Sequence, residues 1–166
     1  MKYAKITNGI VTQIQPNSET GFVQVPDNTI CGMVQQTDGT FISSTSLADI
    51  KIAKISELNL SCEQTIISGF PSSALGTEHY YQSDRDDQTN LLGLVVAGQD
   101  SILKCGVLQT DGTILWTFDT PHTIGEIQQV FSAGATYKME QLQKCNTLKQ
   151  QVNSATTEAD IDLIVW

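Results

Sequence analysis

Three aspartates and a serine lie within five residues of one another, at Ser83, Asp84, Asp86 and Asp87. Closely spaced oxygen ligands of this kind bind hard cations such as Mg²⁺ or Ca²⁺, although the spacing is not that of an EF-hand loop. A helix that begins at Asp84 would place the same carboxylates in its first turn, where the helix dipole favours negative charge. We therefore expect helix capping at these residues, with a metal site as the alternative.

The two histidines, His79 and His122, are the side chains best suited to acid–base chemistry near neutral pH. Catalysis would also require a nucleophile or a second acid at a spacing that a known motif uses, and neither accompanies these histidines in the sequence. We expect both imidazoles to form hydrogen bonds at the ends of secondary-structure elements. The sequence thus predicts a protein that is not an enzyme, without catalytic, cofactor-binding or metal-binding residues.

The four cysteines are not spaced as zinc ligands, because they include no Cys-x-x-Cys pair and no histidine lies at ligand spacing from any of them. Cys62 and Cys145 fall on apolar stripes of predicted helices, which favours buried, reduced thiols; a disulfide between the helices is the alternative. Cys105 begins a predicted strand. Cys31 lies beside Gly32 in a segment with few apolar residues, so it is our candidate for an intermolecular disulfide, with an unpaired thiol as the alternative.

The charge of the chain excludes one large class of partner. Eighteen acidic residues stand against nine basic ones, and the basic residues form no cluster that could neutralise phosphates, so we expect no nucleic-acid binding. The longest apolar run, Leu91 to Gly98, is too short to span a bilayer, and no apolar region follows the opening residues. We expect no membrane insertion and synthesis in the cytoplasm without a signal peptide.

A helix over residues 123–153 is the longest predicted element. Thr123 and Glu126 have the spacing of a capping box at its start. Apolar or small residues then recur at steps of three and four, which predicts one buried stripe. They are Ile124, Ile127, Phe131, Ala135, Met139, Leu142, Cys145, Leu148 and Val152. Such a helix would be about 45 Å long and requires a packing partner.

A second helix is predicted over residues 47–67, with Ser46 as its N-cap and Gly69 as its terminating glycine. Its predicted stripe is Ala48, Ile52, Ile55, Leu58, Cys62 and Ile66. Residues 70–82 are too irregular for a long helix, and we expect a short extended turn there.

A third helix is predicted from Asp84 to Ala97, closed by Gly98. Its apolar side is predicted to be Leu91, Leu92, Val95 and Val96. A β-hairpin is expected over residues 103–118. After the long helix, Thr157 and Asp160 indicate a further helix start, and the apolar end of the chain, residues 161–166, should pack against the domain.

The first 43 residues read as a small β module. The predicted elements are a hairpin over residues 3–15, a strand over 22–25 and a hairpin over 33–42. The dipeptides Asn8-Gly9 and Asp38-Gly39 supply the turns, and Gln-Thr-Asp-Gly-Thr, which contains the second, recurs at residues 109–113 as a repeated turn rather than a repeated domain. The module is too short for a large core, so we expect it to dock elsewhere through a flexible joint at Ser43–Ser46.

These elements predict an α+β fold in two parts. Residues 1–43 form an N-terminal β-hairpin module for attachment or docking. Residues 47–166 form a helical hairpin or bundle with an inserted β-hairpin, organised around the long helix 123–153.

Residues 50–166 resemble a domain of uncharacterised biochemical function found in bacteriophage and prophage tail proteins, often encoded beside tail-fibre genes. The residues that carry the resemblance are Lys51-Ile52, Ile55, Gly69-Phe70, Ser72-Ser73-Ala74-Leu75-Gly76, Tyr80, Ser83-Asp84, Asp87-Gln88, Asn90-Leu91, Gly93, Trp116, Pro121-His122-Thr123 and Trp166.

The front segment is similar to the short leaders of tail-fibre and tail-fibre-assembly proteins. The similarity lies in Asn8-Gly9, the Val-Pro-Asp segment at residues 25–27, and Gly32 shortly before Phe41. Such leaders usually carry an aromatic residue after the glycine, where this chain has Met33.

These resemblances imply a structural component of a phage tail, in a tail fibre or its attachment to the baseplate, that acts through protein–protein contacts. A tail-fibre assembly chaperone absent from the mature virion is the alternative, and a wall hydrolase ranks third. The expected location is the virion tail. The expected partners are other tail proteins, and the two apolar stripes also favour a homo-oligomer.

Overall fold

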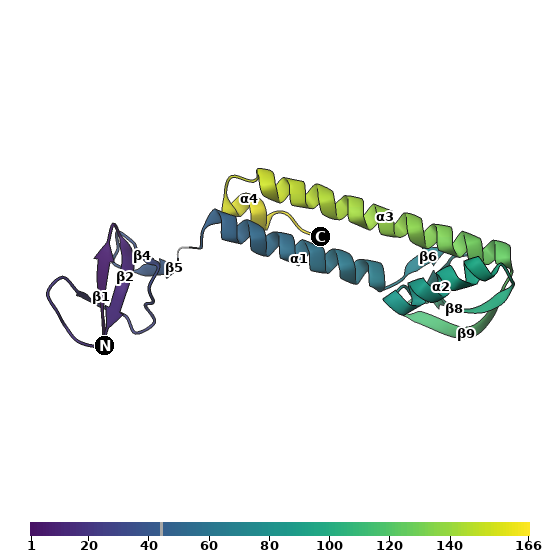
Figure 1. Cartoon of the computed structure of the whole chain (residues 1–166), viewed down its shortest axis with the longest axis horizontal. Coiled ribbons are helices and arrows are strands. Elements are labelled where there is room, and N and C mark those ends of the chain that lie inside the picture. Colours follow the sequence, from purple (N-terminus) through teal and green to yellow (C-terminus); the bar gives the residue numbers. More distant parts are fainter. Residues whose placement is uncertain (44) are drawn as a thin grey trace. The chain divides into compact units, whose positions relative to one another are not determined.

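The structure, a computed structural model, describes residues 1–43 and 45–166 (Figure 1). The expected flexible joint at Ser43–Ser46 therefore falls partly outside the described residues. The fold is α+β, as the sequence predicts. It divides into two compact units, Met1–Asp49 and Ile50–Trp166.

The N-terminal unit is a five-stranded antiparallel sheet with the strand order β3-β1-β2-β4-β5. Its strands are β1 (Lys2–Thr7), β2 (Ile10–Gln15), β3 (Val23–Val25), β4 (Met33–Gln35) and β5 (Phe41–Ser43). Ala4, Val11 and Val25 are its buried residues, with half-buried apolar neighbours such as Phe41 around them. Such a core is small, as the length of the segment predicts.

Both predicted hairpins of this unit are confirmed, and they turn in different ways. Asn8 and Gly9 both have positive φ, 52° and 78°, as a two-residue type I′ turn requires. In the second hairpin only Gly39 has positive φ, and its amide donates to the carbonyl of Gln36 at 3.0 Å. The carboxylate of Asp38 accepts hydrogen bonds from the amide and hydroxyl of Thr40, which lowers the pKa of that carboxyl.

The repeated Gln-Thr-Asp-Gly-Thr sequence folds the same way in its second copy. Gly112 has φ 84° and donates to the carbonyl of Gln109 at 3.0 Å. Asp111 accepts from the amide and hydroxyl of Thr113 at 3.0 and 2.7 Å. Two copies in unrelated surroundings thus adopt one geometry because all of its hydrogen bonds lie within five residues.

The second unit combines helices with a four-stranded sheet. Its elements are α1 (Leu47–Ile67), β6 (Phe70–Ser72), β7 (His79–Tyr81), α2 (Arg85–Ala97), β8 (Ser101–Leu108), β9 (Ile114–His122), α3 (Ile124–Ser154) and α4 (Glu158–Asp162). The three longer helices and the hairpin of β8 and β9 confirm the sequence predictions. The expected short extended turn at residues 70–82 is instead a pair of strands, β6 and β7, which extends that hairpin to the sheet order β6-β7-β8-β9.

Helix starts in this unit are fixed by capping boxes. Reciprocal side-chain and backbone hydrogen bonds join Asp84 to Asp87, Thr123 to Glu126 and Thr157 to Asp160. The same pattern joins Ser46 to Asp49 at the start of α1. The predicted N-caps are therefore confirmed. They can be read from the sequence because a capping box depends only on residues within one turn.

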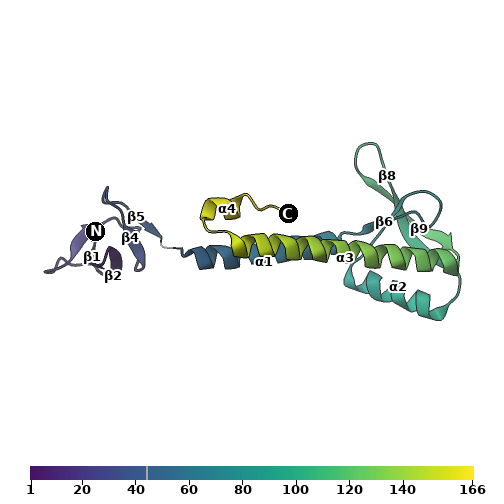
Figure 2. The same cartoon turned by 90° about the horizontal axis from the view of Figure 1, so that it is seen from above.

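α1 and α3 run antiparallel, side by side, and the end of the chain packs against them (Figures 1 and 2). Leu58 of α1, Val152 of α3 and Ile164 of the tail form one buried cluster. The indole of Trp166 packs on a second cluster and donates from Nε1 to the Thr65 hydroxyl at 2.8 Å. The expectation of a packed tail is confirmed for Ile161, Ile164 and Trp166, whereas Leu163 and Val165 are exposed.

The predicted stripes of both long helices are partly wrong in phase. In α3 the fully buried residues are Ile127, Val130, Cys145 and Val152. Met139 is 53 % exposed and Leu142 is 45 % exposed. The buried line passes through Gly134, which faces the ring of Phe70 and which a search for apolar side chains cannot detect. In α1, Ile52 is exposed because it lies about 120° around the helix from the buried Leu58.

One test of the corrected phase compares two identical substitutions. Leu58→Ala removes a fully buried side chain and should lower the free energy of unfolding by about 2 to 5 kcal/mol. Leu142→Ala removes a side chain that is nearly half exposed and should cost less than about 1 kcal/mol. Urea denaturation measures both, and equal losses would show that Leu142 belongs to the core.

A second test concerns the close approach of Gly134 to Phe70. A Cβ at position 134 would lie 2.7 Å from Cζ of Phe70, a buried ring in the core between the sheet and α3. Gly134→Ala should therefore destabilise the unit by about 1 to 3 kcal/mol. The control is Gly93→Ala in α2, where a Cβ meets no neighbouring atom and the gain in helix propensity should stabilise by about 1 kcal/mol. Thermal unfolding reports both signs, and stabilisation by Gly134→Ala would contradict the packing.

Candidate functional site

The acidic cluster at the start of α2 acts as a cap. The Asp84 carboxylate accepts from the Asp87 amide at 2.8 Å, and the Asp87 carboxylate accepts from the Asp84 amide at 3.2 Å. Burial raises the pKa of Asp87 against the lowering effect of that backbone hydrogen bond. The expectation of capping is confirmed. Among the residues that the structure describes, no group of three or more His, Cys, Asp or Glu side chains could hold a metal ion.

Both histidines hydrogen-bond locally, as the sequence predicts. His122 is buried at the end of β9, where its Nδ1 lies 2.8 Å from the carbonyl oxygen of Thr120. Because a carbonyl only accepts, Nδ1 carries the proton and Nε2 accepts from the Tyr81 hydroxyl at 2.9 Å. Burial raises the pKa of Tyr81, so this hydroxyl remains a donor. His79 lies 2.9 Å from the Thr77 carbonyl oxygen through its own Nδ1.

Cys62 and Cys145 face each other across the contact between α1 and α3. The Cys62 thiol donates to the Gln141 carbonyl at 3.6 Å, and the Cys145 thiol donates to the Leu58 carbonyl at 3.7 Å. Gln141 lies four residues before Cys145, and Leu58 lies four residues before Cys62. The two hydrogen bonds are therefore reciprocal between the helices. Burial, reinforced by the neighbouring Cys145, raises the pKa of the Cys62 thiol. All four cysteines are free, which confirms the expected reduced thiols in this pair; the intermolecular disulfide of Cys31 stays a prediction.

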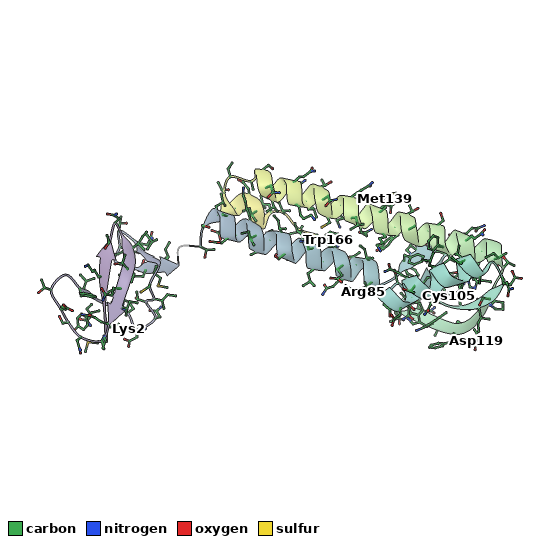
Figure 3. All side chains as sticks on the ribbon, viewed as in Figure 1. Lys2, Arg85, Cys105, Asp119, Met139 and Trp166 are labelled. Carbon is green, nitrogen blue, oxygen red and sulfur yellow. The ribbon has the colours of Figure 1, made fainter. Side chains whose placement is uncertain are left out.

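A groove on one side of the α1–α3 pair is the main surface feature that the sequence did not reveal. It consists of two adjoining cavities, of about 460 and 310 Å³, which share Arg85, Gln88 and Lys138 as lining residues. The larger lies between α2 and α3, and the smaller between the end of α1 and the second half of α3. We call the two together the open groove. In Figure 3, Arg85 lies where the end of α1 meets the start of α2.

Apolar and basic side chains line the open groove together. Ile67 of α1, Leu92 of α2 and Leu142 of α3 are 39 %, 48 % and 45 % exposed. Lys138 donates to the Gln88 side-chain oxygen at 3.0 Å, and Lys149 donates to that of Asn59 at 3.1 Å. The sequence signal for this surface was present, since Phe131, Ala135 and Leu142 of the predicted core stripe line it, but periodicity alone assigned them to the interior.

A second exposed apolar region lies on the sheet. Lys104 of β8 places its ammonium 5.1 Å from the ring centre of Trp116 and 4.6 Å from that of Phe118. Phe118 is 67 % exposed. The lysine covers part of both rings through cation–π contacts, so this region is less open than its aromatic composition indicates.

Cysteine exposure gives a direct test of these assignments. Cys31 is exposed, whereas Cys62, Cys105 and Cys145 are buried. A thiol reagent should therefore label Cys31 rapidly in the native chain and reach the other three only on unfolding. Cys31→Ser should abolish the rapid phase. Rapid labelling of two or more thiols in the folded protein, measured by mass spectrometry of the intact chain, would contradict the burial of one or more of these three cysteines.

Comparison with known proteins places the chain in one family. No helix in the described part of the chain has the length and apolar character needed to cross a membrane. No curated protein and no solved structure matches the chain. The model of a family described as a domain of unknown function, DUF4376, matches residues 49–165, which are most of the chain and all of the open groove. The chain therefore belongs to the DUF4376 family.

Proposed function

We propose that this protein is a structural component of a bacteriophage tail, in a tail fibre or its attachment to the baseplate, and that it acts through protein–protein contacts. The sequence resemblances to tail proteins supply the setting. The open groove is the observation that supports action through protein–protein contacts, because adjoining exposed apolar side chains mark interaction surfaces.

The groove lies on the side of the α1–α3 pair that is only partly covered. The tail with Trp166 closes one side, and α2 covers part of the other (Figure 2). Where neither the tail nor α2 covers the pair, Ile67 of α1 and Leu142 of α3 remain accessible. A partner that covers the groove would remove these apolar groups from water. This burial would stabilise the complex by about 25 cal/mol for each Å² of apolar surface.

The N-terminal sheet offers a separate surface, which we propose as the attachment device. Its small core leaves four large aliphatic side chains exposed, Ile10, Val23, Ile30 and Ile42. Cys31 lies in the same unit and is accessible for a disulfide with a partner. A docked sheet of this size would gain stability from the partner that it binds.

The proposal is tested by quantitative mass spectrometry of purified phage particles. A structural component should be present in a fixed ratio to the other tail proteins after gradient purification. If the protein occurs in lysates of infected cells and is missing from particles, the assembly-chaperone alternative replaces the proposal.

A truncated chain separates the two surfaces. A chain that begins at Thr45 should keep its helical circular dichroism, because the core clusters of the second unit lie within residues 58–166. It should fail to enter particles if the N-terminal sheet is the attachment device. Normal incorporation would assign attachment to the second unit, and loss of the helical signal would show that the two units do not fold separately.

A further inference from the structure

We propose that the open groove binds an acidic amphipathic helix of a partner protein. The inference deepens the proposed function by naming the class of partner, and it rests on that function.

The shape is that of a missing third helix. α1 and α3 form a two-helix layer, and α2 lies on the side of that layer opposite the tail (Figure 2). α2 has thirteen residues and accompanies only the first half of α3, to which the side chain of Gln88 is tied by Lys138. Among the described residues of the second unit, no such helix accompanies the second half of α3 on this side, and the smaller cavity lies there. A helix that runs along α3 from the larger cavity into the smaller one would fill both.

The lining provides an apolar contact along that path. Phe131 and Leu92 lie in the larger cavity, and Ile67 and Leu142 lie in the smaller one. A helix that docks in such a groove presents apolar side chains at i, i+3 or i+4, and i+7. From Phe131 to Lys149 the α3 backbone advances by about 27 Å, which an occupant of about 18 residues would span.

The charges select an acidic occupant. The whole chain carries a net charge of −9 and only nine basic residues, yet three of these, Arg85, Lys138 and Lys149, line the open groove. The acidic residue of its lining is Glu63, which is paired with Arg85 at 2.7 Å. Lys138 and Lys149 donate to neutral amide oxygens, so a carboxylate could replace those partners with a charge-assisted hydrogen bond. A second copy of this acidic chain would meet net repulsion.

The two lysines also set a spacing for recognition. Lys138 and Lys149 are eleven residues apart in one helix, close to three turns, so their Cα atoms lie on the same side of α3, separated by about 16 Å along its axis. A helix aligned with α3 meets both when its carboxylates stand at a similar spacing, with apolar residues between them opposite Leu142. The pattern distinguishes a specific ligand from any acidic peptide.

The test uses a synthetic stapled helix as the probe, because an unconstrained peptide of about 18 residues is only marginally helical. Its leucines follow the apolar spacing above, and two glutamates stand eleven positions apart. A matched peptide carries lysines in place of the glutamates. Fluorescence anisotropy with the full-length protein should show saturable binding of the acidic peptide and at least about tenfold weaker binding of the basic one.

Variants of the protein locate the site. Lys138→Glu combined with Lys149→Glu should weaken the acidic peptide about tenfold or more and restore binding of the basic peptide. The matched control is Lys144→Glu, since Lys144 lies over Trp166 on the opposite side of α3 and its replacement should change affinity by less than about twofold. Circular dichroism and thermal unfolding confirm that each variant is folded.

Several results would overturn the inference. They are no binding of the acidic peptide at millimolar concentration, equal affinity for both peptides, or the same loss in the Lys144→Glu control. A concentration-dependent dimer that Leu142→Glu disrupts, observed by sedimentation, would assign the groove to a second copy. If the protein binds the peptide but is missing from particles, only the proposed role in the phage tail is contradicted. If it is present in particles but does not bind the peptide, only the proposed binding site in the groove is contradicted.

Discussion

The contact between α1 and α3 is the interaction on which the second unit depends. Most of the stability of a helix in a folded protein comes from packing of its buried face rather than from propensity, and α1 buries Leu58, Cys62 and Ile66. Cys62 of α1 and Cys145 of α3 have small side chains at this contact. Each thiol therefore reaches a backbone carbonyl of the other helix. At its far end Lys51 caps α3 by donating to the carbonyl of Asn153 at 2.8 Å.

The tail completes this contact from one side, and its position determines where the molecule remains open. Trp166 covers the two cysteines and Ile66, with Lys144 stacked 4.4 Å from its ring centre. Because the tail is bound there, the short helix α2 is what covers the opposite side of the two-helix layer within the described residues of the second unit. The open groove and its lysines follow from this difference in cover. The packing that makes the unit stable thus also makes one surface available.

Features encoded within a single turn could be predicted from the sequence. Thr123 with Glu126 forms the expected capping box, the aspartates at the start of α2 cap it as expected, and Asn8-Gly9 forms the expected turn. These features were predictable because every atom involved lies within a few residues. The strands β6 and β7 were missed because each has three residues and is defined by its pairing, β6 with β7 and β7 with β8. Pro71 in β6 further disguised the strand, and it is tolerated there because β6 is at the sheet edge.

The candidate site was missed for a related reason. The apolar residues of α3 cover a wider part of the helix surface than the part that contacts α1 and the sheet. Hydrophobic periodicity does not show which side of this wide apolar face is buried. The buried line of α3 includes Gly134, whose missing side chain admits the ring of Phe70, and Val130 is buried on this line whereas Leu142 is accessible. Sequence alone therefore identified Phe131, Ala135 and Leu142 of the open groove as apolar but placed them in the core.

Hydrogen exchange of the full-length protein tests the central claim, that α1 and the second half of α3 hold each other in place. Amides near Leu58 and near Val152 should exchange with the same opening free energy, because both belong to one buried cluster and open together. Trp166→Ala should lower both values by the same amount. Amides of α1 that exchange as fast as an unprotected peptide, while those of α3 stay protected, would contradict the account.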